Sequence, residues 1–237
     1  EFRRVLFRSL ASTFSTVQAQ RKANLKDTVI QLKVVSVMPN YSLTSPTMIQ
    51  ALSSQRRIAG STSLVEIKAD NQHLATMKDA LRLQPGVIIQ DMFGGNDQPR
   101  LNIRGSGIQS NPQRRGVYLL QDGIPVNFSD GSYVVGIMDA MTAQYIEVFK
   151  GANALRFGAG TLGGALNFVS RTALSDTTTS IKLEGGSYGS FGLTFTTGRR
   201  MGAWDVFAAS TYNRQDGYRI YNQNRRLTTS LNIGWRN

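Results

Sequence analysis

Hydrophobic and polar residues alternate along the C-terminal part of the chain. Phe191, Leu193 and Phe195 alternate with glycine and threonine, and the run from Leu227 to Arg236 alternates in the same way. Because successive side chains of a β-strand point to opposite faces, this alternation predicts strands with one apolar and one polar face. The run 179–184 also alternates, with Ile181 and Leu183 on one face, and the run 204–212 is strand-like with less distinct faces, so two further strands are predicted there.

The segment before these strands has a mixed pattern. Short β-prone runs, separated by glycine-rich loops, lie at 63–67, 100–104, 116–120 and 145–149. A helix is predicted to begin with Thr76 as its N-cap and to end before Pro85-Gly86. The pattern therefore predicts a compact α+β domain that ends near Thr172. An earlier apolar run, 28–37, predicts either a strand or a strand-competent linker.

The polar face of the C-terminal strands is rich in Gly, Thr, Ser and Asn, and Trp235 ends one apolar stripe. A soluble sheet buries its apolar face, whereas a membrane β-barrel turns that face to lipid and has a polar interior. The composition of the polar face favours the barrel, and a secreted, soluble all-β ligand-binding module is the alternative. Because four strands cannot close a barrel, the barrel interpretation predicts that the chain is a truncated fragment.

Composition removes several classes of function. The chain has no cysteine and a single histidine, His73, so thiolate metal sites, thiol nucleophiles and Ser-His-Asp catalysis lack their residues. We therefore expect a non-enzyme with no cofactor and no metal site. The net charge of +12 is typical of nucleic-acid binding, but the basic residues are spread along the chain. Most of them are interpreted as solvated surface, and no nucleic-acid partner is expected.

Residues 1–19 resemble the end of a secretory signal, with basic residues, an apolar stretch and a small-residue ending. Cleavage is expected after Ala19. Arg8 interrupts the apolar stretch, which raises the hypothesis that residues 1–9 are foreign sequence joined to a signal remnant.

Gly158, Gly160 and Gly163 have the G-x-G-x-x-G spacing of a dinucleotide-binding turn. Such a turn needs a strand immediately before the glycines and a helix that opens on them. Here the preceding strand ends at Phe149, and the residues that follow, 165–169, are predicted as another strand. The motif is therefore interpreted as a backbone device that allows tight turns and close packing.

Five stretches of the α+β domain resemble, in order and spacing, the plug domain of TonB-dependent outer-membrane receptors. They are LQPGV (83–87), IRG (103–105), LQDGIPV (120–126), IEVFKG (146–151) and the run from RFG (156–158) to VSR (169–171). A softer similarity to ferric-citrate and other siderophore receptors rests on 137–140 and 166–171. The resemblance implies a small mixed sheet with short helices inside a 22-stranded barrel, of which this chain would hold the first strands.

The resemblance implies four segments: the signal remnant (1–19), a periplasmic linker with a TonB box (20–50), the plug (51–172) and barrel strands (173–237). It also implies active transport across the outer membrane, with the plug gating the barrel. The similarity to siderophore receptors implies that the transported substrate is a ferric siderophore. The partners would be the TonB protein of the inner membrane, a ferric siderophore or similar chelate, and outer-membrane lipid. The plug and N-terminus would face the periplasm.

Roles for individual residues follow from the same resemblance. The proposed TonB box, which could instead be an edge strand of the plug, comprises Asp27, Thr28, Val29, Ile30 and Gln31. Ligand contacts are expected from loop residues Gln98, Arg114, Arg115, Asn127, Phe128 and Tyr133. Polar contacts between plug and barrel are expected from Arg104, Glu147, Lys150 and Arg171.

Overall fold

The computed structural model describes residues 46–67, 76–90, 99–106, 115–158, 160–218, 220 and 222–236. All of them belong to one compact unit, Asn40–Asn237. The proposed signal remnant, the TonB box at 27–31 and the apolar run 28–37 lie outside the described residues.

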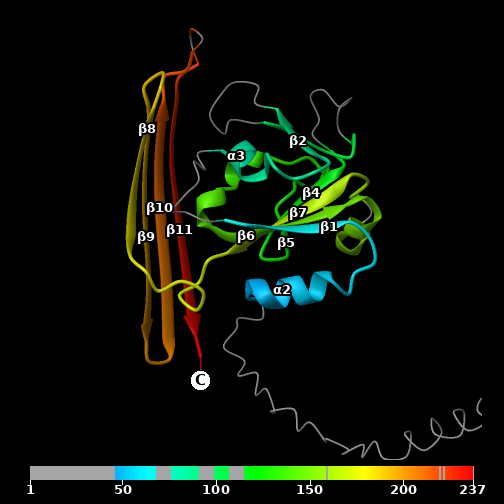
Figure 1. The fold of residues 1–237 in the computed structure, drawn as a ribbon, viewed down its shortest axis with the longest axis horizontal. Helices are drawn as coiled ribbons and strands as arrows, with labels where there is room; N and C mark the ends of the chain where they lie inside the picture. Colours follow the sequence, from blue (N-terminus) through cyan, green and yellow to red (C-terminus); the bar gives the residue numbers. More distant parts are fainter. Residues whose placement is uncertain are drawn as a thin grey trace, which may run out of the picture. The chain divides into compact units, whose positions relative to one another are not determined.

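A mixed sheet of five strands organises the first part of this unit (Figure 1). Across the sheet the strands are β1 (Thr62–Glu66), β6 (Ala143–Lys150), β7 (Gly164–Ser170), β4 (Val117–Gln121) and β5 (Ile124–Pro125). Neighbours run antiparallel except β7 and β4, which are parallel. A separate antiparallel pair consists of β2 (Val87–Gln90) and β3 (Arg100–Ile103). We call residues 46–172 the mixed-sheet domain.

Short helices accompany the sheet. They are α2 (Met48–Gln55), α3 (Met77–Leu81) and the 3-10 turns η2 (Val135–Ile137), η3 (Ala140–Thr142) and η4 (Gly151–Phe157). The predicted cap of α3 is confirmed, because the Thr76 hydroxyl accepts the Asp79 amide at 3.3 Å and the Asp79 carboxylate accepts the Thr76 amide at 3.1 Å. The pattern did not predict α2, which buries only Ala51 and Gln55 and so has no long apolar stripe. No helix in the described ranges is long and apolar enough to cross a membrane.

The central strands of the five-stranded sheet, β6, β7 and β4, are largely buried on both faces. On one face the largest apolar cluster includes Leu119, Ile146 and Leu166, each 0% exposed. On the other face Tyr145 and Val169 pack against α2. Strands that are covered on both sides are apolar along their whole length, which explains why β6 and β7 lack the alternation seen near the C-terminus.

Four antiparallel strands follow, in chain order, and we call them the strand meander. They are β8 (Ser180–Gly186), β9 (Ser190–Met201), β10 (Trp204–Gln215) and β11 (Asn224–Trp235). All four predicted strands are confirmed. β10 and β11 are each 12 residues long, longer than the alternating runs, because pairing continues from Trp204 with Trp235 to Gln215 with Asn224.

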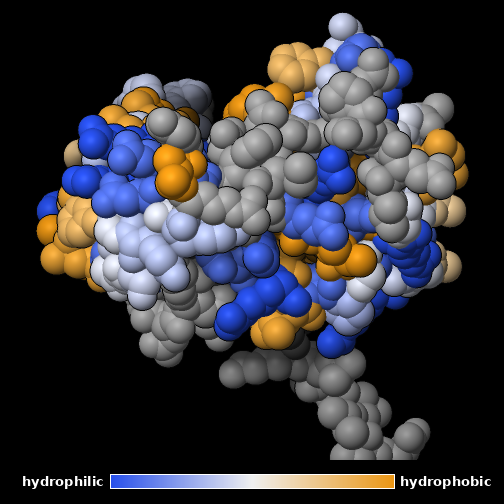
Figure 2. All heavy atoms as spheres, turned by 90° about the horizontal axis from the view of Figure 1, so that it is seen from above, coloured by the Kyte–Doolittle hydropathy of each residue, from blue (hydrophilic) through white to orange (hydrophobic). Residues whose placement is uncertain are grey.

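The two faces of the strand meander differ as the alternation predicted. Ile181, Leu227 and Leu231 are 68%, 70% and 64% exposed, whereas Thr194 and Thr196 are 5% and 2% exposed. Figure 2 shows hydrophobic side chains that reach the surface at several places among strongly hydrophilic ones. A soluble sheet buries its apolar face and exposes its polar one, so this arrangement argues against the soluble module.

Candidate functional site

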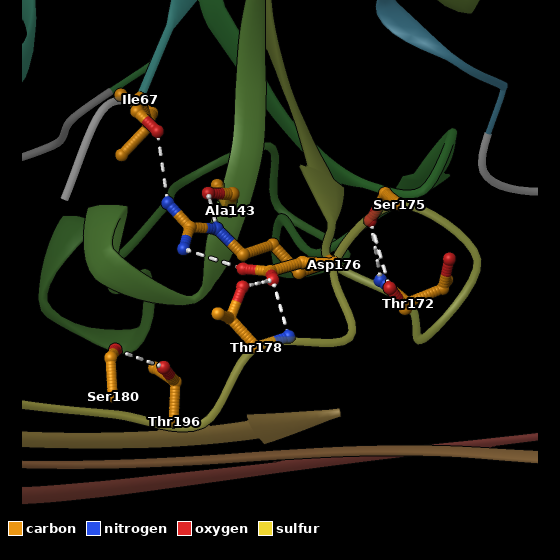
Figure 3. Close-up of polar contacts among 9 residues, drawn as sticks. Ile67, Ala143, Thr172, Ser175, Asp176, Thr178, Ser180 and Thr196 are labelled. Carbon is orange, nitrogen blue, oxygen red and sulfur yellow. Dashed lines mark hydrogen bonds and ion pairs between the residues drawn. The ribbon is translucent and has the colours of Figure 1, made fainter. Parts of the chain in front are cut away.

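Residues 171–179 connect β7 to the strand meander, and Arg171 holds the start of this segment. Its side chain donates from Nε to the Ala143 carbonyl at 3.0 Å and from Nη2 to the Ile67 carbonyl at 2.9 Å. Figure 3 shows the Asp176 carboxylate beside the same guanidinium, with an oxygen 3.7 Å from Nη1. Arg171 therefore ties together β6, the end of β1 and the connecting segment.

Two side-chain turns shape the connecting segment. The Ser175 hydroxyl donates to the Thr172 carbonyl at 2.9 Å and accepts the Thr172 amide at 3.1 Å. The Asp176 carboxylate accepts the Thr178 amide at 2.9 Å and the Thr178 hydroxyl (Figure 3). Because Ser and Asp side chains bond to nearby backbone in such turns, these few residues define the path between the two sheets.

Two arginines of the strand meander donate to backbone carbonyls outside it. Arg200 on β9 donates from Nε to Ala173 at 2.7 Å and from Nη2 to Leu174 at 2.6 Å. Arg226 on β11 donates from Nη2 to Met138 at 3.3 Å. Hydrogen bonds from charged donors are among the stronger ones, so these contacts fasten the meander to the mixed-sheet domain and its exit. The sequence interpretation missed both residues.

Small residues bring the backbones close at the same place. Ala173 is 0% exposed and clusters with Phe207 and Ala209 of β10. A Cβ added to Gly198 of β9 would lie 2.1 Å from the Asp176 carbonyl oxygen, so a larger residue there would push the connecting segment away. Together with the arginine contacts, this packing forms what we call the seam.

Three further residues were predicted to contact the barrel, and their described contacts lie in the mixed-sheet domain. Glu147 accepts a hydrogen bond from Asn167 Nδ2 at 2.8 Å. Arg104 has a left-handed φ of 51°, and its Nη1 is 3.1 Å from a Cβ built on Gly151. Lys150 is 7% exposed. Burial lowers the pKa of its ammonium group, and the positive charge of Arg104 lowers it to a smaller extent. Partners for these residues on further strands stay a prediction.

Arg115 is a predicted ligand residue that remains accessible. Its guanidinium lies 3.4 Å from Asp130, and the two side chains are 49% and 50% exposed. The pKa of Asp130 is lowered mainly by the Ser132 hydroxyl, which donates at 2.6 Å, and less by Arg115. Exposed ion pairs contribute little to stability, so this pair leaves Arg115 available to an anion. Gln98 and Arg114 lie outside the described residues.

The other predicted ligand residues differ in accessibility. Phe128 is 55% exposed. The side-chain amide of Asn127 is bound to strand β4, where its Oδ1 accepts the Leu119 amide at 2.8 Å and its Nδ2 donates to the Val117 carbonyl at 3.0 Å. Tyr133 is 3% exposed in the largest apolar cluster, and its hydroxyl donates to the Leu101 carbonyl at 3.0 Å. Tyr133 is thus a core residue, which corrects its predicted ligand role.

The glycine motif lies between η4 and β7, and a strand follows it, as predicted. A Cβ on Gly163 would lie 1.6 Å from Ser106 Oγ, and one on Gly164 would lie 2.5 Å from the Phe149 carbonyl oxygen. These glycines allow close approach of backbones, which supports their interpretation as a backbone device. Within the described ranges, no three His, Cys, Asp or Glu side chains gather as a metal site.

Tyr145 holds the first described residues on the sheet. Its side chain is 0% exposed and packs against Ala51 of α2, while its hydroxyl donates to the Pro46 carbonyl at 2.8 Å. Burial raises the pKa of the phenol above its ordinary value of 10.0, and the carboxylates of Glu147 and Asp122 raise it further. The hydrogen bond therefore needs the neutral phenol.

Tyr145→Phe is expected to destabilise the mixed-sheet domain by about 1 kcal/mol near neutral pH, because it removes this hydrogen bond. The folded state keeps the phenol neutral, whereas the unfolded state ionises it near its ordinary pKa of 10.0. The stability that depends on this phenol is therefore complete below that pH and falls as the pH rises above it. Urea unfolding at neutral and alkaline pH should show the wild type losing its advantage over Tyr145→Phe. Tyr118→Phe is the control, and a gap that does not change with pH would contradict the raised pKa.

Comparison with known proteins identifies the mixed-sheet domain. Residues 54–165 match the family described as TonB-dependent Receptor Plug Domain. The chain is 23% identical over 179 residues to the Vitamin B12 transporter BtuB of Vibrio vulnificus (strain CMCP6), a match that covers 75% of this chain and 28% of the relative. The chain therefore spans little more than a quarter of that relative's length.

Solved structures share the fold. The copper transporter OprC matches with a TM-score of 0.55 and 17% identity over 74% of this chain and 28% of its own. The siderophore receptor PiuA from Acinetobacter baumannii matches with a TM-score of 0.55 and 20% identity over 73% of this chain and 24% of its own. These relatives are named as transporters or receptors rather than enzymes, in agreement with the expected non-enzyme. The predicted fold, an α+β plug followed by antiparallel strands, is confirmed, and residues 54–165 belong to the plug-domain family of TonB-dependent receptors.

Proposed function

We propose that this chain belongs to a receptor that takes up a ferric siderophore across the outer membrane, with the mixed-sheet domain gating a barrel. The observation that carries this proposal is the polarity of the strand meander, whose apolar face is exposed and whose threonine-rich face is buried. A sheet of this kind needs lipid on one side and a polar neighbour on the other. The seam provides polar contacts on the second side, where Arg200 and Arg226 donate to carbonyls.

Transport through a plugged barrel needs an external source of work, because the outer membrane has no ATP. The proposed TonB box at 27–31 would supply the connection by adding a strand to the inner-membrane TonB protein. This strand addition relies on backbone hydrogen bonds and tolerates varied side chains. Downstream of the box, Pro46 and α2 are held on the sheet by Tyr145, so a pull from TonB would first act on the mixed-sheet domain there.

Val29→Pro is expected to reduce uptake of a radiolabelled ferric siderophore by at least about tenfold, because proline removes an amide donor from the pairing strand. The measurement uses cells that produce the full-length receptor, with site-directed crosslinking to TonB as a second readout. Val29→Thr keeps both the amide and the β-branched shape, so it should transport normally. Normal uptake and crosslinking in Val29→Pro would rule out the box at this position.

The accessible loop residues suit an anionic ligand. Arg115 and Phe128 are exposed. Gln98 and Arg114 are also predicted ligand residues, and they lie outside the described residues. Arginine binds the anionic oxygens of a chelate through charge-assisted hydrogen bonds, and Phe128 offers an apolar contact. Cobalamin is a second candidate substrate, because one relative is named as a vitamin B12 transporter. Growth rescue under iron limitation and under cobalamin limitation separates the two, and rescue by cobalamin alone would overturn the siderophore proposal.

A further inference from the structure

Two arginines face each other on the exposed side of the strand meander. Arg214 on β10 and Arg225 on β11 are directly paired, and both are exposed. Opposed residues of this kind have Cβ atoms about 5 Å apart, and like charges there destabilise the pairing. Asp216 offsets part of the charge, with Oδ1 3.2 Å from Arg214 Nη2. Among the residues that the structure describes, Arg225 makes no such ion pair, so positive charge remains in excess.

The arginine pair lies where the apolar part of this face ends. The next pair on this face is the partly buried Tyr212 with the exposed Leu227. The far end of the face is marked by Trp204 and Trp235, whose ring centroids are 6.5 Å apart. From Trp204 to Arg214 the strand rises about 33 Å, or about 25 Å across a membrane if it tilts by about 40°. This height equals that of the apolar band of a membrane barrel, so the two arginines would lie at the level of the lipid head groups.

We propose that Arg214 and Arg225 together bind the phosphate of an anionic membrane lipid. A phosphate between two guanidinium groups accepts paired hydrogen bonds from each and replaces their repulsion with attraction. Phe191, opposite Arg214 on β9, has its ring centroid 6.5 Å from that of Tyr212 and provides an apolar surface below the phosphate. A Cβ on Gly185, the partner of Phe191 on β8, would meet no atom within 4 Å, so space is open beside this ring.

The occupant is inferred to be a lipid rather than a soluble anion because the charged pair continues directly into apolar surface. A lipid satisfies both parts, whereas inorganic phosphate satisfies only the arginines. The inference rests on the proposed function, since it requires the exposed face to be in contact with a membrane. The chain also contains a matched control in Arg199, which is exposed on β9 but pairs with Val206 and has no arginine opposite it.

The test uses the full-length receptor reconstituted in phosphatidylcholine vesicles, with or without phosphatidylglycerol or lipid A. After extraction in mild detergent, native mass spectrometry measures the anionic lipid that remains bound. We expect the double variant Arg214→Gln with Arg225→Gln to retain about tenfold less anionic lipid than the wild type, the effect of losing one or two charge-assisted hydrogen bonds. Arg199→Gln should retain as much as the wild type. Heat-modifiable migration shows whether each protein is a folded barrel.

Equal lipid retention by the folded double variant and the wild type would overturn the lipid site and leave the transport function untouched. An equal loss in Arg199→Gln would overturn it as well, because the effect would then be one of general charge. Inorganic phosphate that displaces the lipid completely would assign the site to a soluble anion. If the double variant does not fold, the single variant Arg225→Gln takes its place, because it keeps the ion pair between Arg214 and Asp216. Lipid retention by this variant equal to that of the wild type would then overturn the lipid site. Failure of the wild type to insert into vesicles would overturn the proposed function and this inference together.

Discussion

Gly164→Ala is expected to destabilise the mixed-sheet domain by about 3 kcal/mol, which lowers the ratio of folded to unfolded protein more than about 100-fold. Gly164 begins β7 with a φ of 156°, and a Cβ there would lie 2.5 Å from the Phe149 carbonyl oxygen and 3.0 Å from two atoms of Ile103. Phe149 lies in β6, next to β7 in the sheet, and Ile103 is 0% exposed. Neither neighbour can move without disturbing the core.

Urea unfolding of the full-length receptor, with protease cleavage of the mixed-sheet domain as readout, measures this loss. Gly185→Ala is the matched control, because its Cβ would meet no atom within 4 Å. It should change the free energy of unfolding by less than about 0.5 kcal/mol. Gly163→Ala should also be destabilised, since its Cβ would lie 2.3 Å from Ser106 Cβ, and Ser106→Gly should restore part of the loss. Wild-type stability in Gly164→Ala would contradict the close approach of β6 and β7.

Arg171→Ala is the second change with a large expected effect, a loss of about 3 kcal/mol. The Arg171 side chain is 9% exposed and satisfies the carbonyls of Ala143 and Ile67, at 3.0 Å and 2.9 Å. Alanine would leave both carbonyls without this donor and would remove the ion pair with Asp176. Arg171→Lys should recover less than half of the loss, because an ammonium cannot reproduce the planar fork of the guanidinium.

Arg156→Ala is the control for this prediction. Its guanidinium carbon lies 5.5 Å and 5.1 Å from the ring centroids of Phe149 and Phe157, a contact at the surface that is worth about 0.5–1 kcal/mol. Urea unfolding should separate the two variants, and limited proteolysis should cut between β7 and β8 faster in Arg171→Ala alone. Equal losses in both variants would show that Arg171 does not hold the connecting segment.

The strands of the meander could be predicted because a period of two is a local property of the chain. β10 was the least distinct of them, since Phe207 and Ala209 place apolar side chains on the buried, mostly polar face. Both pack against Ala173, which lies on the connecting segment. A contact of this kind joins residues that are distant in the sequence, so no local pattern predicts it.

The candidate site was harder to predict than the fold, for the same reason. Tyr133 was expected to contact ligand because it is an aromatic residue with a polar hydroxyl in a glycine- and serine-rich loop. Its hydroxyl instead donates to the Leu101 carbonyl on β3, and its ring packs in the core. Arg200 and Arg226 were grouped with the solvated basic residues. The alternation of side chains along β9 could have identified Arg200, because residues an even number apart share a face and Arg200 lies on the same face as Thr196, which is 2% exposed.

The consecutive arginines at 199–200 and 225–226 place one guanidinium on each side of the strand meander. A strand that slips by one residue exchanges its two faces, yet at these doublets it would still offer an arginine to both sides. The doublets therefore cannot specify the register of β9 or β11. That information must come from the rows of threonine and leucine between the strand ends. A strand that pairs one residue out of step would still present an arginine to the carbonyls beside the meander, and it would lose the sorting of apolar side chains.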